Sequence, residues 1–123
     1  MNMKKIYVIH RRAFDYEKEL YAPLKKQADF EFVFPHTGEN EVRNSKDLIR
    51  DCDIVLAEVS FPSTGSGIEL GRAESLGVPI VAIFKKGSQV FSSIKFLTDD
   101  IIEYDDLEKD FDKIRKILNL SCK

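Results

Sequence analysis

Two runs of apolar residues constrain the fold of this chain most strongly. Residues 53–59 read DIVLAEV and residues 78–84 read VPIVAIF, and Glu58 is the one charged residue inside either run after its start. A strand with one face in water alternates apolar and polar residues, whereas a parallel strand between two layers of helices is apolar almost throughout. The two runs therefore predict central strands of a parallel sheet that is covered on both faces.

The rest of the chain continues this alternation of strand and helix. Further strands are predicted at residues 5–9, 30–34 and 101–104, and helices at 15–27, 45–52, 66–76 and 107–120. Pro23 weakens the first helix midway, and Gly77 ends the third as its C′ residue. We therefore predict an α/β fold over residues 1–123 as a single domain: a doubly wound (flavodoxin/Rossmann-like) five-stranded parallel sheet with helices on both faces.

Composition narrows the classes of partner. A formal net charge of -2 argues against a nucleic acid polymer as the ligand, because proteins that bind phosphate backbones carry a basic excess. No apolar run has the length of a signal peptide core or a membrane span. Cys52 and Cys122 stand far apart, which indicates neither a zinc site nor a disulfide framework. We expect a cytoplasmic protein that binds no metal and no membrane.

The stretch PSTGSGIELGRA, residues 62–73, follows the third predicted strand, at the edge of the sheet where ligands of such folds bind. Ser63 precedes a helix whose N-terminus attracts anions, and Gly65 and Gly67 let a ligand approach the backbone. Glu69 is expected in the first turn of that helix, where the dipole holds a carboxylate ionised. For such a cluster taken alone, helix capping is the simpler interpretation. A carboxylate aimed at a sugar could instead attack the anomeric carbon without metal or cofactor.

Several other residues leave two interpretations open. Glu58, inside an apolar strand, is either a general acid with a raised pKa or a buried hydrogen-bonding partner. His10 could protonate a departing base or have no chemical role. His36 opens a polar loop, which favours a surface or substrate-gating role. Phe91 and Phe96 belong either to the core or to a dimer interface.

DIVLAEVSFPSTGSGIELGRA, residues 53–73, resembles the nucleoside 2-deoxyribosyltransferase superfamily, most closely its small 2′-deoxynucleoside 5′-monophosphate N-glycosidases. The likeness extends to KIYVI, QVFSSI and IIEYDDLEKDFDKI. It implies a small doubly wound domain, usually a homodimer, that needs no cofactor. Such a protein hydrolyses or transfers the N-glycosidic bond of a deoxynucleoside or its 5′-monophosphate.

The resemblance also implies roles for individual residues. Glu69 falls on the nucleophile of the family and Tyr7 on an active-site tyrosine. Ser63 falls where the monophosphate hydrolases have a phosphate-binding serine and the nucleoside transferases tend to have an aspartate. Because a serine hydroxyl can donate to a 5′-phosphate that an aspartate would repel, a small nucleotide is the expected substrate. Ser92 falls on a serine that reaches the phosphate from the neighbouring subunit.

The chain departs from the family pattern at three places. Residues 10–13 read His-Arg-Arg-Ala where the family often has Gly-Ser-Ile-Arg, so Arg12 is the candidate for the phosphate-binding arginine and Arg11 the substitute. Ile68 replaces the tyrosine before the nucleophile. A family aspartate falls on Ser45, so Asp47 or Glu58 would have to take the acid role.

These arguments yield one predicted site and three candidate functions, of which hydrolysis or transfer at an N-glycosidic bond is the first. The predicted catalytic residues are Glu69, Glu58 and Asp47, and the predicted substrate-binding residues are Tyr7, His10, Arg12, Ser45, Ser63, Gly65, Gly67 and Ser92. The replaced aspartate and tyrosine leave open a module that binds a nucleotide without turning it over. A TIR-like NAD glycohydrolase is a third interpretation, because that chemistry also uses a glutamate on a small doubly wound domain.

Overall fold

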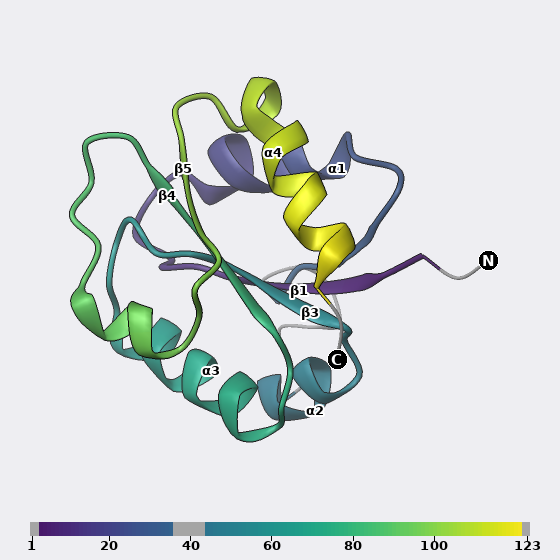
Figure 1. Ribbon diagram of the computed structural model, residues 1–123, viewed down its shortest axis with the longest axis vertical. Helices are drawn as coiled ribbons and strands as arrows, with labels where there is room; N and C mark the ends of the chain where they lie inside the picture. The colour runs from purple at the N-terminus through teal and green to yellow at the C-terminus, as the bar shows by residue number, and fades with distance from the viewer. Residues whose placement is uncertain (1–2, 36–43, 122–123) are drawn as a thin grey trace.

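The computed structural model describes residues 3–35 and 44–121, and its centre is a single parallel sheet (Figure 1). The strand order is β2-β1-β3-β4-β5, which confirms the predicted flavodoxin-like arrangement. The strands are β1 (Lys5–Ile9), β2 (Glu31–Val33), β3 (Ile54–Glu58), β4 (Ile80–Lys85) and β5 (Ile101–Tyr104). His36 lies outside the described residues.

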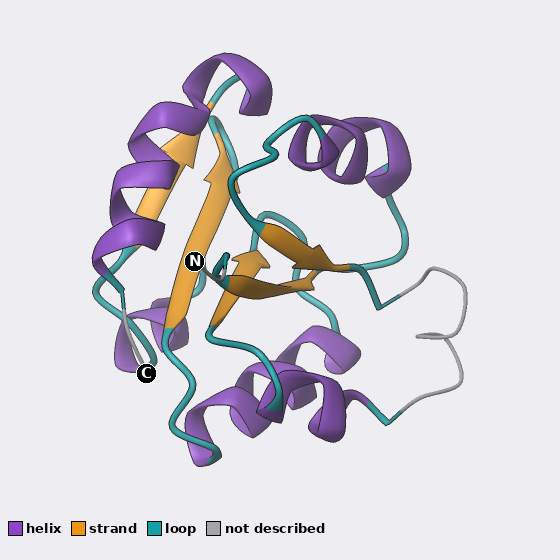
Figure 2. Cartoon of the chain, turned by 90° about the vertical axis from the view of Figure 1, so that its right-hand side faces the viewer, coloured by secondary structure: helices purple, strands orange, loops and turns teal. Residues whose placement is uncertain are grey.

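Helices cover the sheet on both sides (Figures 1 and 2). One layer holds η1 (Glu17–Tyr21), α1 (Ala22–Lys25) and α4 (Leu107–Leu120), and the other holds α2 (Ser45–Arg50), α3 (Thr64–Ser75) and the 3₁₀ turn η3 (Ser92–Phe96). In the described part of the chain, no helix is both long enough and apolar enough to span a bilayer.

Strand β3 shows why its sequence is almost uniformly apolar. Ile54 and Leu56 pack in the core beneath α1 and α4, whereas Val55 and Ala57 pack in the core beneath α2 and α3. Successive side chains of a strand point to opposite faces, so a strand between two helical layers needs apolar residues at every position. Each fully buried Val, Leu or Ile contributes about 1.5–3 kcal/mol to stability.

Pro23 divides the first predicted helix in two. Residues Glu17–Tyr21 form a π-helical turn in which the Ala22 N–H donates to the Glu17 carbonyl, and α1 follows. Proline has no N–H for the i to i−4 ladder and its ring crowds the preceding turn, so the local widening relieves both problems.

Two helices begin at other residues than the sequence suggests. Asn44, not Ser45, caps α2, because its side chain accepts a hydrogen bond from the Lys46 N–H at 2.8 Å. Helix α3 begins at Thr64 rather than near residue 66, since the Ser63 hydroxyl accepts from the Ser66 N–H at 3.2 Å. Glu69 therefore lies in the second turn of α3 and not in the first.

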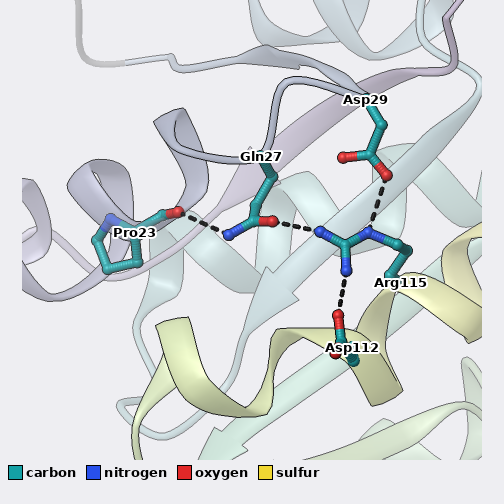
Figure 3. Close-up of polar contacts among 5 residues, drawn as sticks. All are labelled: Pro23, Gln27, Asp29, Asp112 and Arg115. Carbon is teal, nitrogen blue, oxygen red and sulfur yellow. Dashed lines mark hydrogen bonds and ion pairs between the residues drawn. The ribbon is translucent and has the colours of Figure 1, made fainter.

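One arginine fastens α4 to the segment between α1 and β2 (Figure 3). Arg115 binds the Asp29 carboxylate through Nε at 2.8 Å and also donates to Gln27 and Asp112. The Gln27 amide in turn donates to the Pro23 carbonyl at 3.4 Å. This network lies on the α1 and α4 layer, away from the α2 and α3 layer that carries Glu69.

Candidate active site

A pocket of about 330 Å³ opens at the carboxyl ends of β1 and β3. The loop after β1 and the N-terminal part of α3 form its walls, as the parallel topology predicts. Its lining residues are His10, Arg11, Arg12, Ala13, Ser63, Gly65, Ser66 and Glu69. Among the described residues, Glu69 supplies the only carboxylate of this lining.

The Glu69 carboxylate is held by one oxygen and open at the other. Its Oε2 accepts a hydrogen bond from the hydroxyl of Tyr7, a fully buried residue of β1. Its Oε1 accepts no hydrogen bond from any residue of the described ranges. No buried side-chain oxygen or nitrogen in those ranges lacks a partner, so Oε1 is open to solvent. A carboxylate with one oxygen fixed and one exposed is suited to act as a nucleophile.

The electrostatics of Glu69 differ from the expectation. Burial raises its pKa above the ordinary value, while the Tyr7 hydrogen bond and the charge of Arg72 act in the opposite direction. The sequence predicts Glu69 in the first turn of the helix, and this position is wrong, because α3 begins at Thr64 and Glu69 lies in the second turn. The effect of the helix dipole fades beyond the first turn, so it does not hold Glu69 ionised. Burial also raises the pKa of Tyr7, and the adjacent Glu69 raises it further, so Tyr7 remains a donor.

The start of α3 forms the polar end of the pocket. The Ser63 hydroxyl donates to Ser66 Oγ at 2.8 Å while it accepts from the Ser66 N–H. A side chain at Gly65 or Gly67 would meet no atom within 4 Å, so the space above both glycines is open. Gly65 lines the pocket, but Gly67 lines a neighbouring cavity instead. Ser66, which the predicted site omits, also lines the pocket and is hydrogen-bonded to Ser63.

The loop after β1 brings two exposed arginines and one buried histidine to the pocket. His10 is 3% exposed; its Nδ1 lies 2.8 Å from the Arg11 carbonyl and its Nε2 lies 2.6 Å from the Tyr21 hydroxyl. A carbonyl can only accept, so Nδ1 carries the proton and Nε2 accepts from Tyr21. The ring also packs against Tyr16 at 4.5 Å between centroids. His10 thus lines the pocket with its ring, while both of its nitrogens are hydrogen-bonded to other residues of the protein.

Glu58 lies on the other face of the sheet. Strand alternation places its side chain with Leu56, and the Tyr104 hydroxyl donates to its Oε2. The Ser60 N–H donates to its Oε1 at 2.5 Å. The side chain is 2% exposed, and burial raises its pKa. Of the two interpretations of Glu58, the geometry matches the buried hydrogen-bonding partner.

Ser45 and Asp47 lie on α2 and line neither this pocket nor the neighbouring cavity. Asp47 is exposed and forms an ion pair with Arg50 at 3.1 Å. The Ser45 hydroxyl accepts a hydrogen bond from Arg72 Nη1 and so joins α2 to α3. The structure therefore does not bring Asp47 to Glu69.

A second cavity of about 200 Å³ lies on the other side of the α3 N-terminus and shares Ser63 and Ser66 with the first. Phe91 and Ser93, from the chain around η3, also line it. Ser92 is exposed and lines neither cavity. Phe91 and Phe96 are 56% and 88% exposed, which excludes a place in the core.

The described residues include no group of three or more His, Cys, Asp or Glu side chains placed to hold a metal ion. Cys52 is buried, and burial raises the pKa of its thiol to about 12.

Comparison with known proteins gives a family match over nearly the whole chain. Residues 3–118 match the family described as nucleoside 2-deoxyribosyltransferase. The 5-hydroxymethyl-dUMP N-hydrolase of Mus musculus is 45% identical over 53 residues, which cover 42% of this chain and 31% of that protein. The enzyme of the same name from Rattus norvegicus is 43% identical over 53 residues, with 42% and 32% covered. The matched segments thus span about a third of these relatives.

Among solved structures, the CMP N-glycosidase of Clostridium botulinum has the same fold. Its TM-score is 0.62 at 22% identity, and the alignment covers 93% of this chain and 98% of that one. At this level of identity the likeness establishes the doubly wound architecture.

Proposed function

This chain belongs to the nucleoside 2-deoxyribosyltransferase family, and from that premise we propose that it hydrolyses or transfers the N-glycosidic bond of a (deoxy)nucleoside 5′-monophosphate, with Glu69 as nucleophile. One observation carries the proposal. The Glu69 carboxylate accepts a hydrogen bond from Tyr7 at one oxygen, is open at the other, and lines one pocket together with Arg11, Arg12 and two serines.

The pocket fits a nucleotide better than a nucleoside. Arg11 and Arg12 carry positive charge, and the serine-capped start of α3 adds N–H groups that attract an anion. A 5′-phosphate bound there would extend its sugar toward Glu69. The names of the two rodent relatives also specify a monophosphate as the substrate of those proteins.

The proposed reaction has two steps. Glu69 Oε1 attacks C1′ of the sugar, the C1′–N bond breaks with its electron pair on the base, and the departing base takes a proton from water. The resulting glycosyl ester is then attacked at C1′ by water or by a second base, which releases Glu69 as a carboxylate. Tyr7 keeps the carboxylate oriented and stabilises its anionic form against the cost of burial.

We also propose that the protein acts as a homodimer. Phe91, Ser92 and Phe96 are exposed on or beside η3, close to the second cavity at the α3 N-terminus. A second copy that covers this apolar surface would bring the partner's Ser92 toward the bound phosphate.

The test is release of free base from a panel of nucleoside 5′-monophosphates and the matching nucleosides, followed by chromatography. Glu69→Gln should lower turnover by about 1000-fold or more, since it removes the nucleophile and leaves the shape of the side chain. Glu74→Gln, an exposed residue on the same helix, should keep full activity. Absence of base release from every compound by folded wild type would refute the proposal, as would an active Glu69→Gln variant.

A nucleotide-binding module without turnover is the second candidate. The positions of Asp47 and Glu58 favour it, because neither residue lines the pocket. Among the described residues, the pocket therefore has no second carboxylate to act as a general acid. Thermal shift with nucleoside monophosphates separates the two functions. A stabilising shift that is equal in wild type and Glu69→Ala, with no free base from wild type, would support the module.

A further inference from the structure

Helix α3 carries Arg72 three residues after Glu69, so the two side chains share one face of the helix. Oppositely charged residues at this spacing often form an ion pair. Within the described residues, however, no ion pair joins them. Arg72 Nη1 instead donates to the Ser45 hydroxyl of α2, and Glu69 accepts from Tyr7 of β1.

The charged and titratable groups near Glu69 come from β1, from the loop after β1 and from α3 itself. Tyr7 faces it from β1, and His10, Arg11 and Arg12 line the same pocket from the loop after β1. Asp47 of α2 forms an ion pair with Arg50 at the surface and does not line the pocket. Arg72 is the cation whose charge acts on Glu69 against the effect of burial.

We propose that Arg72 is a positioning residue for Glu69, and that the Ser45 hydroxyl holds its guanidinium near the carboxylate but unpaired with it. The positive charge of Arg72 favours the ionised form of Glu69, which is the form that must attack C1′. A direct ion pair would have the opposite effect on turnover, because a guanidinium on Oε1 would block the oxygen that is open to the pocket. Ser45 thus acts on the site through Arg72, although it does not line the pocket.

This inference rests on the proposed function where it concerns turnover, but the charge coupling can be measured without catalysis. The experiment records the carbon-13 signal of the Glu69 carboxyl during a pH titration of ligand-free protein, with Glu69→Gln to assign it. The same titration is made on Arg72→Gln, Arg72→Lys and Ser45→Ala. Lys116→Gln on α4, which removes one exposed positive charge from the opposite layer, is the matched control.

Opposite shifts are expected from the two key variants. Arg72→Gln should move the midpoint of Glu69 to higher pH, and Arg72→Lys should restore part of the difference. Ser45→Ala should move the midpoint to lower pH, because the released guanidinium can now pair with Glu69. Lys116→Gln should leave the midpoint unchanged. In steady-state kinetics, Arg72→Gln should lower kcat/KM at pH 5 relative to pH 8 by about three- to five-fold, because less of Glu69 is ionised at the lower pH once the positive charge is gone.

Two results would overturn the inference. An unchanged midpoint in folded Arg72→Gln would show that the charge does not act on Glu69. A midpoint in Ser45→Ala that stays or rises would show that the serine does not hold the arginine away. If no substrate is turned over, the proposed function fails while the titration still decides the role of Arg72.

Discussion

At the scale of single residues, the buried Glu58 and the half-buried Glu69 have similar partners and different surroundings. Glu58 and Glu69 each accept a hydrogen bond from a tyrosine hydroxyl, from Tyr104 and Tyr7 respectively. Glu58 has its other oxygen bound by the Ser60 N–H, whereas Glu69 leaves Oε1 open. Both carboxylate oxygens of Glu58 are therefore hydrogen-bonded within the fold, whereas one oxygen of Glu69 is available to a substrate.

The raised pKa of Glu58 gives its contribution to stability a definite dependence on pH. An acid with a higher pKa in the folded state contributes stability that is fully present below the unfolded value, near 4.5, and is lost as the pH rises through the folded pKa. Glu58→Gln is uncharged at every pH and lacks this dependence.

We therefore expect the free energy of unfolding of wild type to fall relative to Glu58→Gln as the pH rises from 4 to about 8. Urea unfolding at several pH values measures the difference. Glu74→Gln, at an exposed position, should run parallel to wild type. Parallel curves for Glu58→Gln and wild type would contradict the assignment of Glu58 as a buried carboxylate held by hydrogen bonds.

At the scale of elements, α3 and α4 both begin with a side-chain cap, but only the cap of α3 lies in the candidate site. The Ser63 hydroxyl accepts from the Ser66 N–H at 3.2 Å, and the Asp106 carboxylate accepts from the Lys109 N–H at 3.1 Å. The start of α3 lies in the pocket with Glu69, whereas the start of α4 lies in the opposite layer. A neutral hydroxyl cap tolerates a phosphate nearby, and a carboxylate cap would repel it.

Loss of either cap should cost about 1 kcal/mol of stability. Ser63→Ala should in addition raise KM for a nucleoside monophosphate several-fold and leave KM for the matching nucleoside almost unchanged. Asp106→Ala is the matched control, with the same loss of stability and unchanged kinetics. Thermal unfolding and steady-state kinetics on both substrates test this, and an equal rise in KM for nucleoside and nucleotide would exclude a phosphate role for Ser63.

At the scale of the whole molecule, three of the exposed large apolar side chains lie in the layer of α2 and α3. Phe91 immediately precedes η3, Phe96 is its last residue, and Ile68, 52% exposed, lies on α3 in the same layer. Because each costs free energy in water, a second copy that covers them would gain that energy.

We expect wild type to sediment as a dimer and the double variant Phe91→Ser, Phe96→Ser to sediment as a monomer. The stability of the monomer fold should change little, since both side chains are exposed. Leu120→Ser, at a position 79% exposed on α4, should leave the dimer intact. A wild type that is monomeric at high concentration, or a double variant that stays dimeric, would contradict the proposed interface.

The sequence by itself determined the layers and the strand order of this protein. Apolar runs such as residues 53–59 and 78–84, and the turn at Gly77, whose φ is 71°, are local signals whose meaning does not depend on distant residues. The convergence of Glu69 with the loop after β1 also followed, because parallel strands end at one edge of the sheet.

Only the tertiary structure decided which carboxylate faces the pocket and what holds Arg72. Glu58 points to the other layer because side chains alternate along β3, and Tyr104 meets it from 46 residues away. Arg72 reaches Ser45 across 27 residues, and the start of α3 at Thr64 moves Glu69 out of the first turn. Such contacts depend on register and on the packing of one element against another, and neither quantity is expressed in a local pattern of residues.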